Sequence, residues 1–283
     1  AQEVAAVRAG GWDDDIVVLN PWRPFDAVAT ALLNDPKVIT TVSRPEDLRS
    51  LSQTHPKARV IVEIETAMHR HGLDPRTLTA EDFGGLWFEG WAIHLPAEGS
   101  LVEANRLAQT GLATRTGPIW ASHLSVDDHR TLAATLGVPT YLRVGTRLWL
   151  GDKQAYRTTA TVLDVHPIKR GVALGYHGVP APKDGFIVVA SGGTAHGVAM
   201  AAPVPQRSLR QRGVTVAQGL RDAVGRTLSP YAIAGKKRSF AEPPHMHSSM
   251  IFVPGPDPLV KVGDEIPVTT RMTTVVTDDI RWV

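Results

Sequence analysis

The first half of the chain alternates short apolar runs with segments of helical periodicity. The run at residues 60–64 is apolar at nearly every position and passes into a polar tip, Glu65 to Gly72. A strand buried on both faces is typical of the parallel sheet of an α/β protein. Strands are therefore predicted here and at residues 16–19, 38–42, 86–95, 119–124 and 140–144.

Helices are predicted between these strands. They lie at residues 25–33, 44–51, 101–111 and 125–136. Ser43 is the expected N-cap of the second, with Pro45 in its first turn, and Ser125 is expected to cap the fourth. Six such strand–helix units favour a barrel over a small open sheet.

The pattern changes after about Thr146. Alternating strands are predicted at residues 157–165, 172–176, 186–190, 250–253 and 266–281, with a helix only near 216–224 and an exposed loop at 203–213. We therefore expect two domains, a barrel domain at 1–146 and a β-rich domain at 147–283. Residues 1–9 resemble the middle of a helix without an N-cap, which predicts that further residues precede Ala1.

Composition narrows the function class. Hydrophobic residues make up 43% and charged residues 20% of the chain, as in a soluble globular protein, and cysteine is absent. A formal charge of +2 with scattered basic residues gives no nucleic-acid footprint, and no apolar run is long enough for a membrane span. A cytoplasmic location is the expectation.

Polar and titratable side chains gather where the predicted strands end. In a barrel these carboxyl ends meet at the mouth where active sites are built. Gly145 and Thr146 could offer backbone N–H groups to an anion there. The side chains in question are Arg70, His94, Ser122, His123 and Arg143.

Four motifs, in order, resemble the alanine racemase family. Glu65-Thr-Ala-Met-His-Arg-His-Gly72 is similar to its D-T-G-M-x-R-x-G, and Phe88-Glu-Gly-Trp-Ala-Ile-His94 to its strand ending in T-H-F. Leu142-Arg-Val-Gly-Thr-Arg-Leu-Trp-Leu-Gly151 is similar to V-R-x-G-I-x-x-Y-G. Met246-His-Ser-Ser-Met250, followed by Val260-Lys-Val-Gly-Asp-Glu265, is similar to M-D-Q-x-M and V-G-D-E.

The resemblance implies a (β/α)8 TIM-type barrel, here missing its first strands, followed by a β-rich domain. It also implies pyridoxal 5'-phosphate as cofactor. Arg143 would bond the pyridine nitrogen, with His94 supporting it, and the phosphate would be held by Gly145, Thr146, Ser122 and His123. His123 departs from the family's N-S pair.

The resemblance further implies substrate residues and a partner. Arg70 would face the substrate, and Met246 would offer a backbone contact to the substrate carboxylate. The family's homodimer completes its site with the second domain of the other subunit. The expected activity is interconversion of L- and D-alanine, or of a similar small amino acid, for cell-wall precursors.

Two departures leave alternatives open. The family's Schiff-base lysine motif is not found, so that lysine is expected upstream of Ala1. Thr194 stands where the family has its catalytic tyrosine, and His196 is the nearby residue with a suitable pKa. These departures leave two alternatives, which are a one-base or altered activity, and a non-catalytic protein that serves as a binding or scaffold partner.

His245 and His247 form an H-x-H pair without a clear carboxylate partner, so no metal site is predicted.

Overall fold

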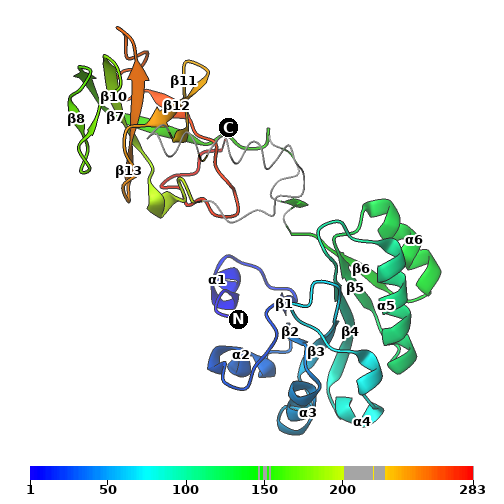
Figure 1. The fold of residues 1–283 in the computed structure, drawn as a ribbon. Coiled ribbons are helices and arrows are strands. Elements are labelled where there is room, and N and C mark those ends of the chain that lie inside the picture. The colour runs from blue at the N-terminus through cyan, green and yellow to red at the C-terminus, as the bar shows by residue number, and fades with distance from the viewer. Residues whose placement is uncertain (146, 149–151, 153, 201–218, 220–226, 283) are drawn as a thin grey trace. The chain divides into compact units, whose positions relative to one another are not determined.

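The computed structural model describes residues 1–145, 147–148, 152, 154–200, 219 and 227–282. It divides into two compact units, Ala1–Gly145 and Thr146–Val283, which are described separately below (Figure 1). The predicted loop at 203–213 lies outside the described residues, as does the predicted helix at 216–224 apart from Gly219.

Unit 1 is built on a six-stranded parallel sheet in which each strand pairs with the next one along the chain. The sheet is curled and forms half of a barrel. This confirms the prediction of a barrel that lacks its first strands. All six strands lie where apolar runs predict them. They are β1 (Ile16–Val18), β2 (Val38–Val42), β3 (Arg59–Ile64), β4 (Trp87–His94), β5 (Ile119–Ser122) and β6 (Thr140–Arg143).

Helices connect these strands, and α3 to α6 cover one face of the sheet (Figure 1). Ser125 caps α6, as expected, because its Oγ accepts the Asp128 N–H at 3.0 Å. The N-cap expected at Ser43 is wrong: Arg44 occupies that position without a side-chain cap, and the Ser43 hydroxyl accepts a hydrogen bond from Arg23. The helical segments are α1 (Val4–Ala9), α2 (Ala27–Ala31), η1 (Leu32–Asn34), α3 (Pro45–Thr54), η2 (Pro75–Thr77), α4 (Ala80–Phe83), α5 (Leu101–Thr114) and α6 (Val126–Leu136).

Side chains of β3 alternate between the two faces of the sheet. Val60, Val62 and Ile64 pack into the main core, together with residues of the covering helices. Ile61 packs on the opposite face with Ile39 and Ala92. Because successive side chains of a strand point to opposite faces, Glu63 shares the face of Ile61.

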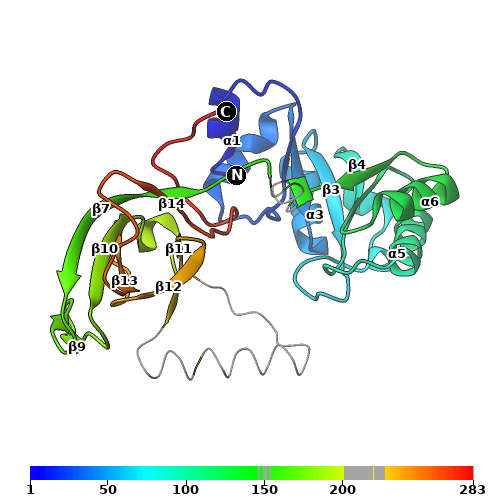
Figure 2. The ribbon, with the colours of Figure 1, turned by 90° about the horizontal axis from the view of Figure 1, so that it is seen from above.

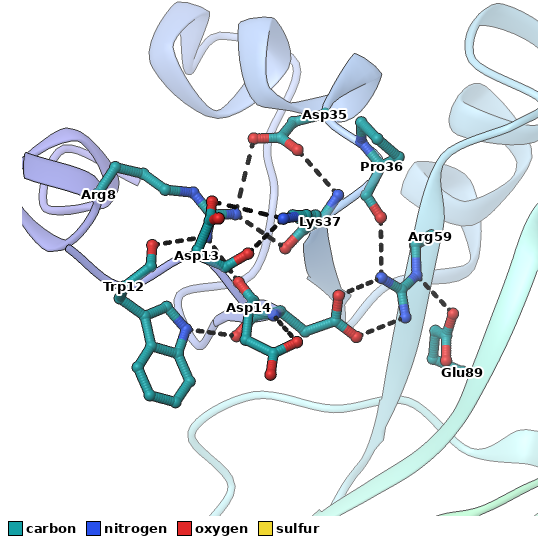
Figure 3. A network of polar contacts seen from close by, with 10 residues as sticks. Arg8, Trp12, Asp13, Asp14, Asp35, Pro36, Lys37, Arg59 and Glu89 are labelled. Carbon is teal, nitrogen blue, oxygen red and sulfur yellow. Dashed lines mark hydrogen bonds and ion pairs between the residues drawn. The ribbon is translucent and has the colours of Figure 1, made fainter.

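A network of charged groups ties together the amino ends of the strands (Figure 3). Arg59 binds both carboxylate oxygens of Asp15, at 2.7 and 2.9 Å, and donates to Glu89 at 2.6 Å. Lys37 pairs with Asp13, and Arg8 donates to the carbonyl of Asp14. In barrels this end serves stability, whereas chemistry belongs to the carboxyl ends.

Unit 2 is an antiparallel sheet in the order β11-β12-β13-β10-β7-β14, with a separate β8–β9 hairpin. Figure 2 shows β7, β10 and β13 side by side. The β-rich second domain is thereby confirmed. Its elements are β7 (Thr159–Ile168), β8 (Ala173–Leu174), β9 (Val179–Pro180), β10 (Gly185–Ser191), η3 (Thr194–His196), β11 (Leu228–Ile233), β12 (Lys236–Phe240), β13 (Ser248–Pro254) and β14 (Glu265–Pro267).

The strand expected at residues 266–281 is wrong in extent. Only Glu265–Pro267 forms a strand, which pairs with β7, and Val268 after it makes one further antiparallel bridge to Tyr231 of β11. Farther along, Val276 and Ile280 are exposed and belong to no strand. In the part of the chain that the structure describes, no helix is long and apolar enough to cross a bilayer.

Candidate functional site

Three of the predicted site residues form one row across the carboxyl edge of unit 1. His94 pairs in register with Ser122 of β5, and Ser122 pairs with Arg143 of β6. Side chains of neighbouring strands in register point to the same face, so the row presents an imidazole, a hydroxyl and a guanidinium together. The parallel pairing thus assembles a site from three separate motifs.

His94 is the centre of this row. Its Nδ1 lies 2.7 Å from the Ser122 Oγ, and its ring meets the edge of the His123 ring at 5.1 Å between centroids. The hydroxyl of Thr66 donates to the His94 carbonyl at 2.9 Å, which joins the end of β3 to the end of β4. His123 is exposed and adopts a left-handed φ of 63° directly after β5.

The electrostatics of the site keep His94 neutral near pH 7. Burial lowers its pKa to about 4, and the nearby positive charges of Arg70, Arg143 and His123 act in the same direction. A neutral imidazole can accept or donate a hydrogen bond without adding charge to a site that already holds two guanidinium groups.

Arg143 has donors without partners. Its Nε and Nη2 are inaccessible to solvent and have no hydrogen-bond partner among the described residues. Burial lowers the Arg143 pKa, while the carboxylate of Glu63 opposes that effect. A buried donor left unpaired costs about 1–3 kcal/mol, so this guanidinium is suited to an acceptor that arrives with a ligand.

Glu63 is a site residue that sequence reasoning missed. Its side chain is buried, and burial raises its pKa against the influence of Arg143, His71 and Arg70. In the sequence, the signal that could have identified Glu63 is a single carboxylate residue within an otherwise apolar run. Its carboxylate lies within electrostatic range of the guanidinium groups of Arg143 and Arg70.

Arg70 is exposed in the loop after β3, within electrostatic range of Glu63, His94 and Arg143. Its neighbour His69 is bound to Glu65 at 2.9 Å. An alanine Cβ at Gly145 would meet nothing within 4 Å, so the backbone there is open to a ligand. Thr146 lies outside the described residues.

Unit 1, which is described throughout, holds two lysines. Lys37 immediately precedes β2, and Lys57 lies two residues before β3. Both therefore lie at the amino ends of strands, opposite the row of His94, Ser122 and Arg143. Neither could form a Schiff base at that row.

The other predicted residues lie together in unit 2, where two loops bind each other through their backbones. Thr194 donates its N–H to the His245 carbonyl at 2.9 Å, and Ala195 donates to the Met246 carbonyl at 3.0 Å. Gly193 permits this approach, because a Cβ at that position would collide with the His245 carbonyl oxygen. Thr194 is exposed.

Both ring nitrogens of His196 are engaged. Nδ1 accepts the Gly193 N–H at 3.2 Å, which places the proton of the neutral ring on Nε2, 3.2 Å from the Asp278 carboxylate. The lone pair of the neutral His196 ring is therefore occupied by a hydrogen bond within its own loop.

Met246 is exposed, and its N–H has no acceptor among the described residues, so this N–H is free for a carboxylate. Within the described part of the chain, no group of three or more His, Cys, Asp or Glu residues could hold a metal ion.

Comparison with known proteins relates the first part of the chain to one protein family. Residues 1–128 match the family model of the alanine racemase N-terminal domain. This confirms, for that part of the chain, the resemblance found in its motifs. No curated protein matches the chain in sequence.

Solved structures share the fold over nearly the whole chain. Biosynthetic alanine racemase from Pseudomonas aeruginosa is 19% identical with a TM-score of 0.66, over 96% of this chain and 74% of that one. Alanine racemase from Bartonella henselae, which carries covalently bound pyridoxal phosphate, is 17% identical with a TM-score of 0.66, over 96% and 75%. The E. faecalis enzyme is 18% identical with a TM-score of 0.60, over 95% and 72%. At these identities the likeness establishes the fold.

Proposed function

We propose that this chain, whose first 128 residues match the N-terminal domain of alanine racemases, binds pyridoxal phosphate at the row formed by His94, Ser122 and Arg143. The observation that carries the proposal is the pair of buried, unpartnered donors on Arg143. The pyridine nitrogen of the cofactor is an acceptor of the kind they require.

The remaining groups fit the other end of the cofactor. The Ser122 hydroxyl, the exposed His123 ring and the open backbone at Gly145, with Thr146 after it, would bind the phosphate. His94 holds the Ser122 hydroxyl in place from its Nδ1. The neutrality of His94 leaves the guanidinium of Arg143 as the charge that meets the ring nitrogen.

Bound pyridoxal phosphate would supply an electron sink for reactions at the Cα of an amino acid. Because a guanidinium does not give up its proton, Arg143 would leave the pyridine nitrogen unprotonated and would limit that sink. Arg70 would bind the carboxylate of a small amino acid. In the homodimer that the family resemblance implies, Met246 of the partner subunit would contact the same group through its backbone. Alanine is the proposed substrate, with D-alanine for cell-wall precursors as the product. The family's homodimer and a cytoplasmic location belong to the same proposal.

Cofactor binding can be tested directly by titrating the full chain with pyridoxal phosphate in equilibrium dialysis. We expect Arg143→Ala to weaken binding by about tenfold to a hundredfold, the range for loss of a charge-assisted hydrogen bond. Arg130→Ala is the matched control, since Arg130 is an exposed arginine on α6 that forms a surface ion pair with Asp127. Equal affinity in the wild type and Arg143→Ala would refute the proposal.

A second candidate is a protein of this fold that binds the ligand without racemising it. Two observations favour it: Thr194 stands at the position of the catalytic tyrosine, and the lysines of unit 1 lie at the wrong end of the sheet. The discriminating measurement is conversion of L-alanine to D-alanine by the full chain saturated with pyridoxal phosphate. Measurable turnover excludes this candidate, whereas tight cofactor binding without turnover of any small amino acid supports it.

A further inference from the structure

Unit 2 contains a carboxylate–imidazole pair that no motif indicated, Glu242 and His245. The Glu242 side chain is 2% exposed, and its Oε1 accepts the His245 Nε2–H at 2.7 Å. Its Oε2 accepts the backbone N–H of Tyr176, also at 2.7 Å. Because both oxygens have partners, the carboxylate is held in a single orientation.

The tip of the β8–β9 hairpin is shaped around this carboxylate. Gly175 adopts a φ of +61°, and a Cβ there would collide with the carboxylate group of Glu242. The backbone can therefore approach closely only with glycine at this position. The Tyr176 ring then packs on the His245 ring, with 5.3 Å between centroids. The pair is a built site, with contributions from the hairpin and from the segment after β12.

The tautomer of His245 follows from its partner. An ionised carboxylate only accepts hydrogen bonds, so the proton of the neutral imidazole lies on Nε2 and the lone pair lies on Nδ1. Nδ1 has no hydrogen-bond partner among the described residues, and the side chain is 34% exposed. A buried carboxylate that orients a histidine and stabilises its imidazolium is the arrangement that enzymes use to make a general base.

We propose that His245 is a general base, held by Glu242, for a small molecule with a weakly acidic O–H or N–H proton. The substrate proton moves to Nδ1, its bonding electron pair stays on the substrate, and the imidazolium pairs with the Glu242 carboxylate. Return of the proton restores the neutral ring. No cofactor enters this step, so the proposal goes beyond the proposed function and does not depend on it.

The position of His245 supports this role. Its carbonyl accepts the Thr194 N–H, and the exposed Met246 follows it in sequence, so the base lies where the two loops of unit 2 bind each other. His196 contrasts with it, since the Nδ1 of His196 is occupied by the Gly193 N–H.

The first test is made on the unaltered full chain. Ring-nitrogen NMR of neutral His245 is expected to show the proton on Nε2 and a bare Nδ1. A proton on Nδ1 overturns the proposal. This measurement needs no variant, so the proposal remains falsifiable even if a substitution at Glu242 prevents folding.

The second test measures reactivity with diethyl pyrocarbonate, followed by mass spectrometry of the histidine peptides. Nδ1 attacks a carbonyl carbon of the reagent, and ethyl carbonate leaves and decomposes to ethanol and carbon dioxide. We expect Glu242→Gln to slow modification of His245 by about tenfold, because the amide keeps a hydrogen-bond acceptor but loses the charge that stabilises the imidazolium.

Two internal comparisons make the result specific. The exposed His247 has no carboxylate partner among the described residues and should be modified more slowly than His245, and His247→Gln should leave the rate at His245 unchanged. His69 pairs with the exposed Glu65, so it serves as a similar carboxylate–imidazole pair that is open to water. Because water screens the charge of Glu65, this pairing should raise the rate of modification of His69 only slightly. A rate at His245 equal to that at His247, or unaffected by Glu242→Gln, overturns the proposal.

Discussion

His94 should make the stability of unit 1 depend on pH in a way that one substitution removes. Its pKa is about 4 in the folded protein against about 6.5 in an unfolded chain. Below the unfolded pKa the unfolded state therefore binds the proton first. Folding free energy is fully retained above about pH 6.5 and is lost as pH falls towards the folded pKa of about 4.

The magnitude follows from this difference. Between about pH 7 and pH 4.5, a shift of this size corresponds to roughly 2 kcal/mol of lost stability. The ring is partly exposed, so solvent screening reduces the expected loss to about 1–2 kcal/mol. His94→Gln cannot titrate, and it should lose that much less stability than the wild type over the same interval.

Urea unfolding followed by tryptophan fluorescence is the assay, because the buried Trp22 and Trp91 both report on unit 1. The quantity of interest is the difference between wild type and His94→Gln at each pH, which cancels the titration of groups common to both. His71→Gln, at an exposed position in the loop after β3, is the control. Identical pH dependence in the wild type and His94→Gln would show that the site does not hold a neutral imidazole.

Two further substitutions test contacts that hold each unit together. Arg59→Met removes the contacts to Asp15 and Glu89 (Figure 3) and should lower the free energy of unfolding by roughly 2 kcal/mol, between the values for exposed and buried ion pairs. Arg130→Met, at a surface pair, should change it by less than about 0.5 kcal/mol in the same urea titration, and equal effects would contradict this account. Gly193→Ala places a Cβ against the His245 carbonyl and should cost about 1–3 kcal/mol by thermal unfolding, with Gly10→Ala as the tolerated comparison; unchanged stability would mean that the two loops are not in contact.

The sequence predicts the strands of unit 1 well because burial on both faces makes them continuous apolar runs. Unit 2 was harder. The strand Leu228–Ile233 contains Pro230, and Lys236–Phe240 is mostly polar, so both form through pairing with neighbouring strands rather than through their own pattern. The apolar positions beyond Pro267 predict a longer strand, but after the single bridge of Val268 to Tyr231 the exposed Val276 and Ile280 lie outside the sheet.

For the site, the sequence indicates which residues end strands but not how those strands align. That His94, Ser122 and Arg143 form one row depends on the register of β4, β5 and β6. The partner of His196 is 82 residues away, and local spacing cannot reveal it. Glu63 and Glu242 were overlooked because a buried carboxylate is recognised by its surroundings, which only the fold supplies.

The strand orders of the two units have a consequence for how the chain folds as it is synthesised. In unit 1 each strand pairs with the one made just before it, so this sheet can grow step by step from its amino-terminal end. In unit 2, β7 is made first but pairs with β10 and β14, the last of which emerges about a hundred residues later. The start of β7, Thr159 to Thr161, therefore stays unpaired until β14 has emerged, and an unpaired strand segment can pair with other strands during that interval.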